Sequence, residues 1–267
     1  MPDWFYHLPI YLALVLIFGL CNMISLFGYM VSHRFLSRVD NKDVVTKVVW
    51  QTVLFFSTIF ITFWIATNWS NLGNLKQTTI REANSVAQLY NDVGSLGGSN
   101  RHFFEIKIWN YLDLVINAEY KHLAKGQESP KTHAAFRDLV LSIYDYQPLQ
   151  QLSDELRYNR ILEQMTNLSN YRENRLAFLS GNLNGPLLLF FIMMIVVGCF
   201  WTGFIYTRSL RFTLFIIMSQ NLIMSSSSWL ILEMDMPFQG QLRVDKTPFI
   251  SVQDEISTFS SYHGLKK

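Results

Sequence analysis

The stretch that most constrains this chain is the charge-free apolar run from Val48 to Trp69. An apolar run of about 18 or more residues is long enough to cross a bilayer as an α-helix. A polar segment at 76–93 follows it closely and keeps an apolar stripe with helical spacing, at Ile80, Ala83, Ala87, Tyr90 and Val93. We therefore expect a membrane helix that either continues into a water-exposed helix or is followed by one after a short connection.

Three further apolar runs, at residues 8–31, 182–206 and 212–232, are also long enough to span a bilayer. A large soluble core would show shorter apolar runs interrupted by charges. We therefore expect an all-α integral membrane protein with four transmembrane helices. Its parts would be a first hairpin at 1–69 (spans 8–31 and 48–69), a helical soluble domain at 70–181, a second hairpin at 182–232 and a C-terminal tail at 233–267.

The soluble domain divides into four expected helices, because glycine- and proline-containing segments interrupt it. The breaks lie at 94–100, 126–130 and Pro148. They leave helical segments at 76–93, 101–125, 131–146 and 149–179. No segment shows a convincing strand pattern.

Composition excludes several classes of function. The chain has 22 Lys and Arg against 20 Asp and Glu, so no basic excess indicates nucleic-acid binding. Its two cysteines, Cys21 and Cys199, lie in apolar runs and give neither a disulfide framework nor a zinc spacing. No nucleophile motif, phosphate-binding loop or dinucleotide fingerprint is present. We therefore expect no enzymatic activity and no cofactor.

Several residues resemble a known family. Arg81-Glu82-Ala83, followed by Leu89-Tyr90, looks like the start of the soluble part of the bestrophin-like domain family. The tail from Asp235 to Val244, with Pro237, Phe238 and Gly240, is similar to the C-terminal motif of that family. Arg172-Glu-Asn-Arg175 and the plan of two spans, a helical insert and two more spans also fit. Tyr120 departs from the pattern, because a Trp is expected there.

The resemblance implies the four-helix membrane plan and, by analogy to true bestrophins, an oligomeric ion channel. The implied partners are the lipid bilayer, further copies of the chain, with a pentamer as one candidate, and inorganic ions. The expected location is a membrane that the chain crosses several times, namely a bacterial inner membrane. No acidic run matches the calcium clasp of true bestrophins, so calcium gating does not carry over.

The side of the membrane that the soluble domain faces stays open. The short links carry Arg34, Arg38, Lys42, Lys47, Arg208 and Arg211. Positive charge in short loops marks the cytoplasmic side, which would place the soluble domain outside. True bestrophins place the corresponding insert in the cytoplasm, and the resemblance therefore implies the opposite orientation.

The span at 48–69 has two candidate pore faces at ~100° per residue. One stripe contains Thr52, Phe56, Phe60, Phe63 and Thr67, and the other contains Gln51, Phe55, Thr58 and Thr62. Three phenylalanines between polar ends resemble a hydrophobic neck, which can gate a pore by dewetting. We favour the first stripe, with Phe56, Phe60 and Phe63 as the neck and Thr52 and Thr67 lining the pore beside it. The simpler alternative is that these rings pack on lipid or on neighbouring helices.

Polar and small residues in the other spans indicate helix packing. Asn221, Ser225 and Ser228 fall on one face of the last span, where hydrogen bonding between helices is favoured over pore lining. Gly19 and Gly28 in the first span allow close approach of another helix.

Glu119-x-x-His122 has the spacing of a carboxylate–histidine metal pair in a helical bundle. Only one such pair is present, whereas metal sites need a cluster of ligands. A solvated helix face explains the pair more simply, so no metal site is expected.

Two classes of function remain from the sequence. The first is an oligomeric bestrophin-like ion channel whose pore is lined by the second transmembrane helix. The alternative is a non-conducting membrane protein whose helical soluble domain binds a partner. An assembly with a hollow axis on the second span would favour the first class.

Overall fold

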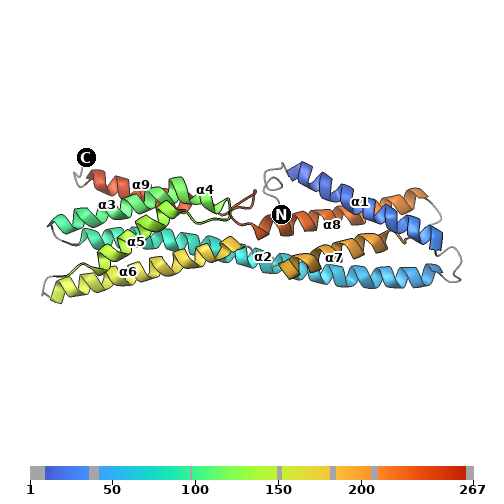
Figure 1. Cartoon of the computed structure of the whole chain (residues 1–267), viewed down its shortest axis with the longest axis horizontal. Coiled ribbons are helices and arrows are strands. Elements are labelled where there is room, and N and C mark those ends of the chain that lie inside the picture. Colours follow the sequence, from blue (N-terminus) through green and yellow to red (C-terminus); the bar gives the residue numbers. More distant parts are fainter. Residues whose placement is uncertain are drawn as a thin grey trace. The chain divides into compact units, whose positions relative to one another are not determined.

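A computed structural model of the protein describes residues 10–35, 42–96, 98–148, 152–180, 185–205 and 210–262 (Figure 1). Within these ranges all regular elements are helices and there is no strand, which confirms the all-α class. The start of the first expected span, residues 36–41 of the link before the second span, residue 181, and residues 182–184 and 206 of the third span lie outside the described ranges. The chain divides into two compact units.

The first unit comprises residues 1–71 and 181–236. It contains α1 (Ile10–Phe35), the first part of α2 (Lys42–Gly94), α7 (Gly185–Thr202) and α8 (Leu210–Asp235). α1 packs against both α7 and α8. The stretches Tyr11–Arg34, Thr46–Gly94 and Leu210–Asp235 are long and apolar enough to cross a membrane, whereas the apolar part of α7, Pro186–Thr202, is shorter.

α1 and α7 approach so closely that their backbones touch. A Cβ atom at Gly28 would lie 2.2 Å from the Phe200 carbonyl oxygen, and one at Gly203 would lie 2.0 Å from the Ser25 carbonyl oxygen. Only glycine fits such a contact, as is common where membrane helices cross. Gly19 has nothing within 4 Å of a Cβ in its place, so it does not serve the close approach that its position in the apolar run suggested.

The second unit comprises residues 72–180 and 237–267. It contains the rest of α2, α3 (Gly98–Leu114), a π-helical turn η3 (Val115–Glu119), α4 (Tyr120–Leu123), α5 (Pro130–Tyr144), α6 (Leu152–Ala177), a 3-10 turn η4 (Phe178–Ser180) and α9 (Thr247–Tyr262). The expected breaks recur as helix ends. α2 stops at Gly94, and α5 begins with Pro130 after Ser129, whose hydroxyl caps the helix.

The core of the second unit corrects the apolar stripe assigned to α2 from the sequence. Val86 and Leu89 are fully buried, whereas Ile80 is 41% exposed. The buried face is rotated relative to the expected one, because two polar residues, Thr79 and Glu82, belong to it. Of the predicted stripe, Ala83 and Val93 are buried in the core, Ala87 and Tyr90 pack against it, and Ile80 lies outside it.

The C-terminal tail contributes to the same core. Phe249, Val252 and Ile256 of α9 are buried against residues of α2, α3 and α6. Their spacing of three and four residues is that of one helical face. Residues 233–267 were expected to form a tail, whereas Thr247–Tyr262 form a helix that packs in the core of the second unit.

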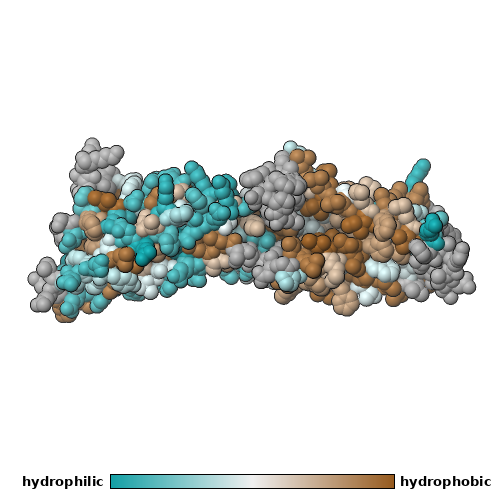
Figure 2. All heavy atoms as spheres, in the orientation of Figure 1, coloured by the Kyte–Doolittle hydropathy of each residue, from teal (hydrophilic) through white to brown (hydrophobic). Residues whose placement is uncertain are grey.

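The two units differ in the surface that they expose (Figure 2). Apolar side chains gather over α1, α7 and α8, and hydrophilic ones cover much of α3 to α6. The first unit exposes many large apolar residues, among them Leu16, Met23, Phe27, Leu189 and Phe215. Such a surface is suited to lipid or to other apolar helices rather than to water.

Candidate functional site

One side of α2 in the first unit packs inward, and the opposite side is open in the single chain. Leu54, Ile61 and Trp64 belong to or pack against the core of the unit. Phe56 and Phe63, two members of the predicted neck, are 60% and 63% exposed. Thr52 and Thr67 of the same stripe are also exposed. Most of the predicted pore stripe therefore lies on a surface that this chain does not cover.

Phe60 has a different environment from the other two phenylalanines. It is half-buried, and its ring centroid lies 4.8 Å from that of Phe190 on α7 in an edge-on arrangement. It also stacks on Trp64, with 5.7 Å between the ring centroids. The structure thus places Phe60 at the edge of the outward face, in contact with the core of its own chain.

The alternative face lies beside the favoured one on the same outward surface. Gln51, Phe55, Thr58 and Thr62 are all exposed. Phe55 contacts Phe56 in an edge-on arrangement, with 5.8 Å between the ring centroids. The Thr52 hydroxyl donates to the Val48 carbonyl and the Thr67 hydroxyl to the Phe63 carbonyl, both at 2.9 Å. These hydroxyl groups therefore have a partner within the helix and still present an oxygen outward.

Asn221 joins α8 to α1 in the interior of the first unit. Its Nδ2 donates to Asn22 Oδ1 at 3.1 Å and to Ser25 Oγ at 3.0 Å. Ser25 in turn donates to the Cys199 carbonyl at 2.7 Å, which connects α7 to the same cluster. Ser225 and Ser228 are also buried, but their hydroxyls return to carbonyls of their own helix. Their role is therefore that of small side chains in a packed interior, and within the described ranges they form no hydrogen bond between helices.

The family-like motif at the end of α8 includes a tight turn. Gly240 has a φ of +66°, a backbone conformation that favours glycine. The Val244 amide donates to the Pro237 carbonyl at 2.7 Å, which closes the turn. Phe238 is buried, and its ring lies edge-on to that of Tyr120 with 6.4 Å between centroids. Asp235, which precedes the turn, is also buried. The motif thus has a clear structural role.

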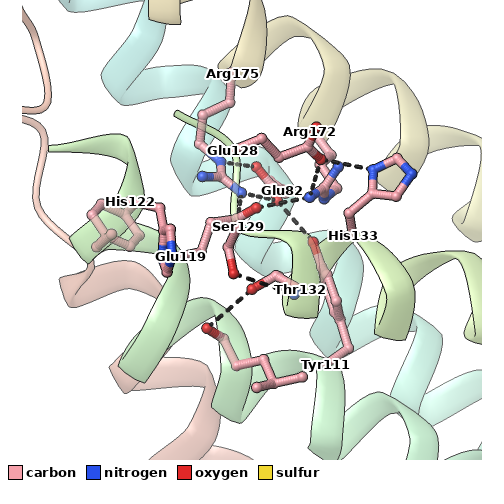
Figure 3. Close-up of polar contacts among 12 residues, drawn as sticks. Glu82, Tyr111, Glu119, His122, Glu128, Ser129, Thr132, His133, Arg172 and Arg175 are labelled. Atoms are coloured by element: carbon pink, nitrogen blue, oxygen red, sulfur yellow. Dashed lines mark hydrogen bonds and ion pairs between the residues drawn. The ribbon is translucent and has the colours of Figure 1, made fainter. Parts of the chain in front are cut away.

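A network of buried charges lies at the centre of the second unit (Figure 3). Arg175 of α6 binds Glu82 of α2 with two hydrogen bonds, from Nε to Oε2 at 2.5 Å and from Nη2 to Oε1 at 2.9 Å. Arg175 Nη2 also donates to Glu119 Oε2 at 2.7 Å, and Arg172 Nη2 donates to Glu119 Oε1 at 2.8 Å. The Tyr111 hydroxyl donates to Glu82 Oε1 at 3.1 Å. Two buried carboxylates are thus paired with two buried guanidinium groups.

Burial and the neighbouring charges shift the pKa values of Arg175 and Tyr111. Burial works to lower the pKa of Arg175, but the Glu82 and Glu119 carboxylates more than offset this and raise it well above its usual value. Burial, assisted by the same carboxylates, raises the pKa of Tyr111 well above its usual value. The faces of Phe249 and Tyr120 also lie against the Arg175 guanidinium, at 5.6 and 5.8 Å from the ring centroids. The raised pKa values keep Arg175 protonated and Tyr111 a hydrogen-bond donor.

The network reaches the surface through Glu128. Its Oε1 accepts from Arg172 Nη2 at 2.9 Å and contacts His133 Nδ1 at 2.8 Å. Burial works to raise the pKa of Glu128, but the hydrogen bonds from His133 and Arg172 outweigh it, and the net pKa is lowered. The side chains become more exposed outward, from 4% for Arg172 to 35% for Glu128 and 57% for His133.

Most of this network was not predicted from the sequence. Glu82, Arg172 and Arg175 were noted only as parts of a family-like pattern, and Glu119 was assigned to a solvated face. That assignment is wrong, because Glu119 is completely buried. His122 does not join Glu119 in a shared site, since its ring Nδ1 contacts the Ala118 carbonyl of its own helix. Among the described residues no group of three or more His, Cys, Asp or Glu could hold a metal ion.

Comparison with known proteins identifies one family. The sequence profile of the Bestrophin-like domain matches residues 10–249. Crystal structures of a bacterial bestrophin homologue from Klebsiella pneumoniae are similar in fold. A variant of it has a TM-score of 0.63 at 14% identity, over 93% of this chain and 97% of that one. Another structure of it has a TM-score of 0.60 at 15% identity, over 92% and 96%. No curated protein sequence matches the chain.

Proposed function

Because the chain belongs to the bestrophin-like domain family, we propose that it is an oligomeric ion channel with four transmembrane helices and a pore lined by α2. True bestrophins are oligomeric ion channels, and a pentamer is the first assembly to test. The proposed location is a bacterial inner membrane, and the proposed function includes no enzymatic activity.

The observation that carries the proposal is the polarity of the outward face of α2. The exposed side chains of α7 are apolar throughout. α2 exposes Gln51, Thr52, Thr62 and Thr67 in a helix that is apolar enough to cross a membrane. Polar groups at membrane depth face protein or water rather than lipid. Copies of the chain arranged around an axis on α2 would remove this face from lipid and enclose a path for ions.

Four spans require α7 to cross the membrane with a short apolar stretch. Pro186–Thr202 is 17 residues long if both ends are counted, which lies at the lower end of what spans a bilayer, ~17–25 residues. Because spans alternate direction, the α4–α5 loop and the start of α8 would then face opposite sides of the membrane. This geometry makes the topology directly testable.

Cysteine labelling tests the four-span topology. Lys125→Cys and Arg211→Cys place a thiol at two exposed positions, and the two native cysteines are buried and give little background. We expect a membrane-impermeant reagent to label only one of the two variants in intact, oriented cells. Labelling of both variants from the same side would reject four spans. The side on which Lys125→Cys reacts also decides between the charge-based orientation and that of true bestrophins.

Conductance measurements test the pore. Phe56 and Phe63, about two helical turns apart on α2, would each form a ring in the narrow part of the pore, and a ring of phenylalanines resists wetting. We therefore expect Phe63→Ala to raise conductance in reconstituted bilayers by roughly twofold or more. Phe215→Ala on α8 is the matched control, because Phe215 is exposed to a similar extent, 66% against 63%. It should leave conductance unchanged.

Phe60→Ala should act mainly through packing, since the Phe60 ring contacts Phe190 within the chain. If the wild type and a correctly assembled Phe56→Ala/Phe63→Ala variant both pass no ions, the channel proposal is wrong. The alternative of a non-conducting, partner-binding protein would then take its place. Leu152 and Leu156 on α6, 75% and 58% exposed, would be the first positions to examine for a partner contact.

A further inference from the structure

The part of α2 in the second unit also has an outward stripe. Asn74, Gln77, Arg81, Asn84, Gln88 and Asn91 are exposed and follow one another at alternating intervals of three and four residues. This spacing keeps them on one side of a helix. The opposite side is buried in the core of the unit through Leu75, Val86, Leu89 and Val93. The stripe is therefore a defined surface of α2.

The composition of this stripe is unusual for a helix in water. Five of its six residues are neutral amides, and the sixth is Arg81. The exposed positions of α6 in the same unit include Glu155, Arg160, Glu163 and Glu173, as is typical of a solvated helix face. Depletion of charge on a surface is typical of positions that face other protein rather than bulk solvent.

Arg81 presents its charge without compensation. The positions one turn away on α2 are Gln77, Thr78, Asn84 and Ser85, which bear no carboxylate. The adjacent Glu82 is buried and bound to Arg175. Among the described residues the Arg81 side chain has no hydrogen-bond or ion-pair partner. Its guanidinium group is therefore the sole formal charge on the stripe.

We propose that this stripe lines the part of the ion path that passes through the second unit, and that Arg81 is its selectivity-determining residue for monovalent anions. The inference rests on the proposed function, in which copies of α2 surround the axis. Both stripes belong to the same helix, α2, Lys42–Gly94. Copies around that axis would bring one Arg81 each to the same level, and rings of Arg favour anions over cations in pores.

Direct packing of the stripes against one another is the competing arrangement. Side chains at alternating three- and four-residue intervals are those that meet in a coiled coil. Arg81 opposes that arrangement, because like charges brought together without water repel strongly. A water-filled gap removes the conflict. Amide side chains both donate and accept hydrogen bonds, so they suit such a gap without adding a charge that competes with Arg81.

Reversal potentials of the reconstituted full-length protein in a potassium chloride gradient test this proposal. We expect the wild type to favour chloride over potassium. Arg81→Gln should lower the chloride-to-potassium permeability ratio by roughly tenfold, and Arg81→Glu should reverse the preference. Lys76→Gln removes the same charge from an exposed position about 140° away around the helix at ~100° per residue. It should stay within about twofold of the wild-type ratio.

Each outcome decides the proposal. A wild-type preference for potassium, an unchanged ratio in Arg81→Gln, or an equal effect of Lys76→Gln would overturn the role of Arg81 while leaving a conducting channel. A silent wild type would overturn the proposed function and, with it, the role of Arg81. All variants are to be compared at equal size by gel filtration, so that a loss of assembly is not scored as a change in selectivity.

Discussion

Replacing Arg175 by methionine should destabilise the second unit by about 3–5 kcal/mol, because it leaves two buried carboxylates, Glu82 and Glu119, without their shared cation. The effect should appear as a large fall in the unfolding temperature of the detergent-solubilised protein and as early proteolysis between residues 72 and 180. Arg157→Met on the same helix is the matched control. The Arg157 side chain is 42% exposed, and its ion pair with Asp154 is long, with 3.7 Å between Nη1 and Oδ1. The loss of this exposed pair should cost about 0–1 kcal/mol.

A second variant separates the buried charge from the lost packing. Combining Arg175→Met with Glu82→Gln neutralises Glu82, the carboxylate that Arg175→Met leaves without a cation, because Glu119 keeps its ion pair with Arg172. The double variant should therefore recover part of the stability lost in Arg175→Met. If Arg175→Met is no less stable than Arg157→Met, or if Glu82→Gln adds a further loss of the same size, the ionic network is not what stabilises this unit.

Gly28→Ala should disrupt the contact between α1 and α7 and lower the stability of the first unit by about 1–3 kcal/mol or more. The added Cβ would lie 2.2 Å from a backbone oxygen, which cannot move without displacing a helix. The measurement is the unfolding temperature and the monodisperse yield in mild detergent. Gly19→Ala, on the same helix, adds the same methyl group where nothing lies within 4 Å, and should be neutral or slightly stabilising.

Equal behaviour of the two glycine variants would contradict the close approach of α1 and α7. A loss in Gly19→Ala alone would instead indicate a contact of that face with another copy of the chain. Both results are read from the same measurement on protein prepared in the same way.

The all-α class was predictable because the apolar runs and the glycine- and proline-containing breaks can be recognised in the sequence alone. Apolar runs and the breaks at 94–100 and 126–130 are local signals, and in the structure α2 ends at Gly94 and α5 begins at Pro130. The phase of each buried face was less predictable, because polar side chains occupy positions in the core. Ile80 was assigned to the core of α2, yet Glu82 lies there instead.

The network did leave a signal in the sequence. Arg172 and Arg175 continue the spacing of the buried Ile161, Met165 and Leu168 on α6. Glu119 likewise continues the spacing of Ile108, Leu112 and Val115. A charged residue in phase with an apolar stripe indicates a buried, paired charge, since an unpaired one would be too costly. Which carboxylate pairs with which guanidinium group depends on how the helices pack, and a single sequence does not specify this packing.

The outward face of α2 in the first unit was partly predictable from the sequence. Helical spacing grouped Phe56, Phe60 and Phe63 on one side of α2. Which of these rings is covered depends on where α7 lies, and the sequence does not show this. Phe190 contacts Phe60 and leaves the other two rings open. The stripe of amides around Arg81 was not recognised, because exposure rather than periodicity distinguishes it.

The order of the charges along the chain affects how the second unit is made. Both buried carboxylates are synthesised before the arginines that pair with them, at sequence separations of 93 for Glu82 and Arg175 and 56 for Glu119 and Arg175. A growing chain therefore carries Glu82 and Glu119 in solvated form until the last turns of α6 have emerged. Contacts so distant in sequence close late and slowly. Assembly of this unit is thus governed by the completion of its C-terminal half, and α9 is added after the ion pairs have become available.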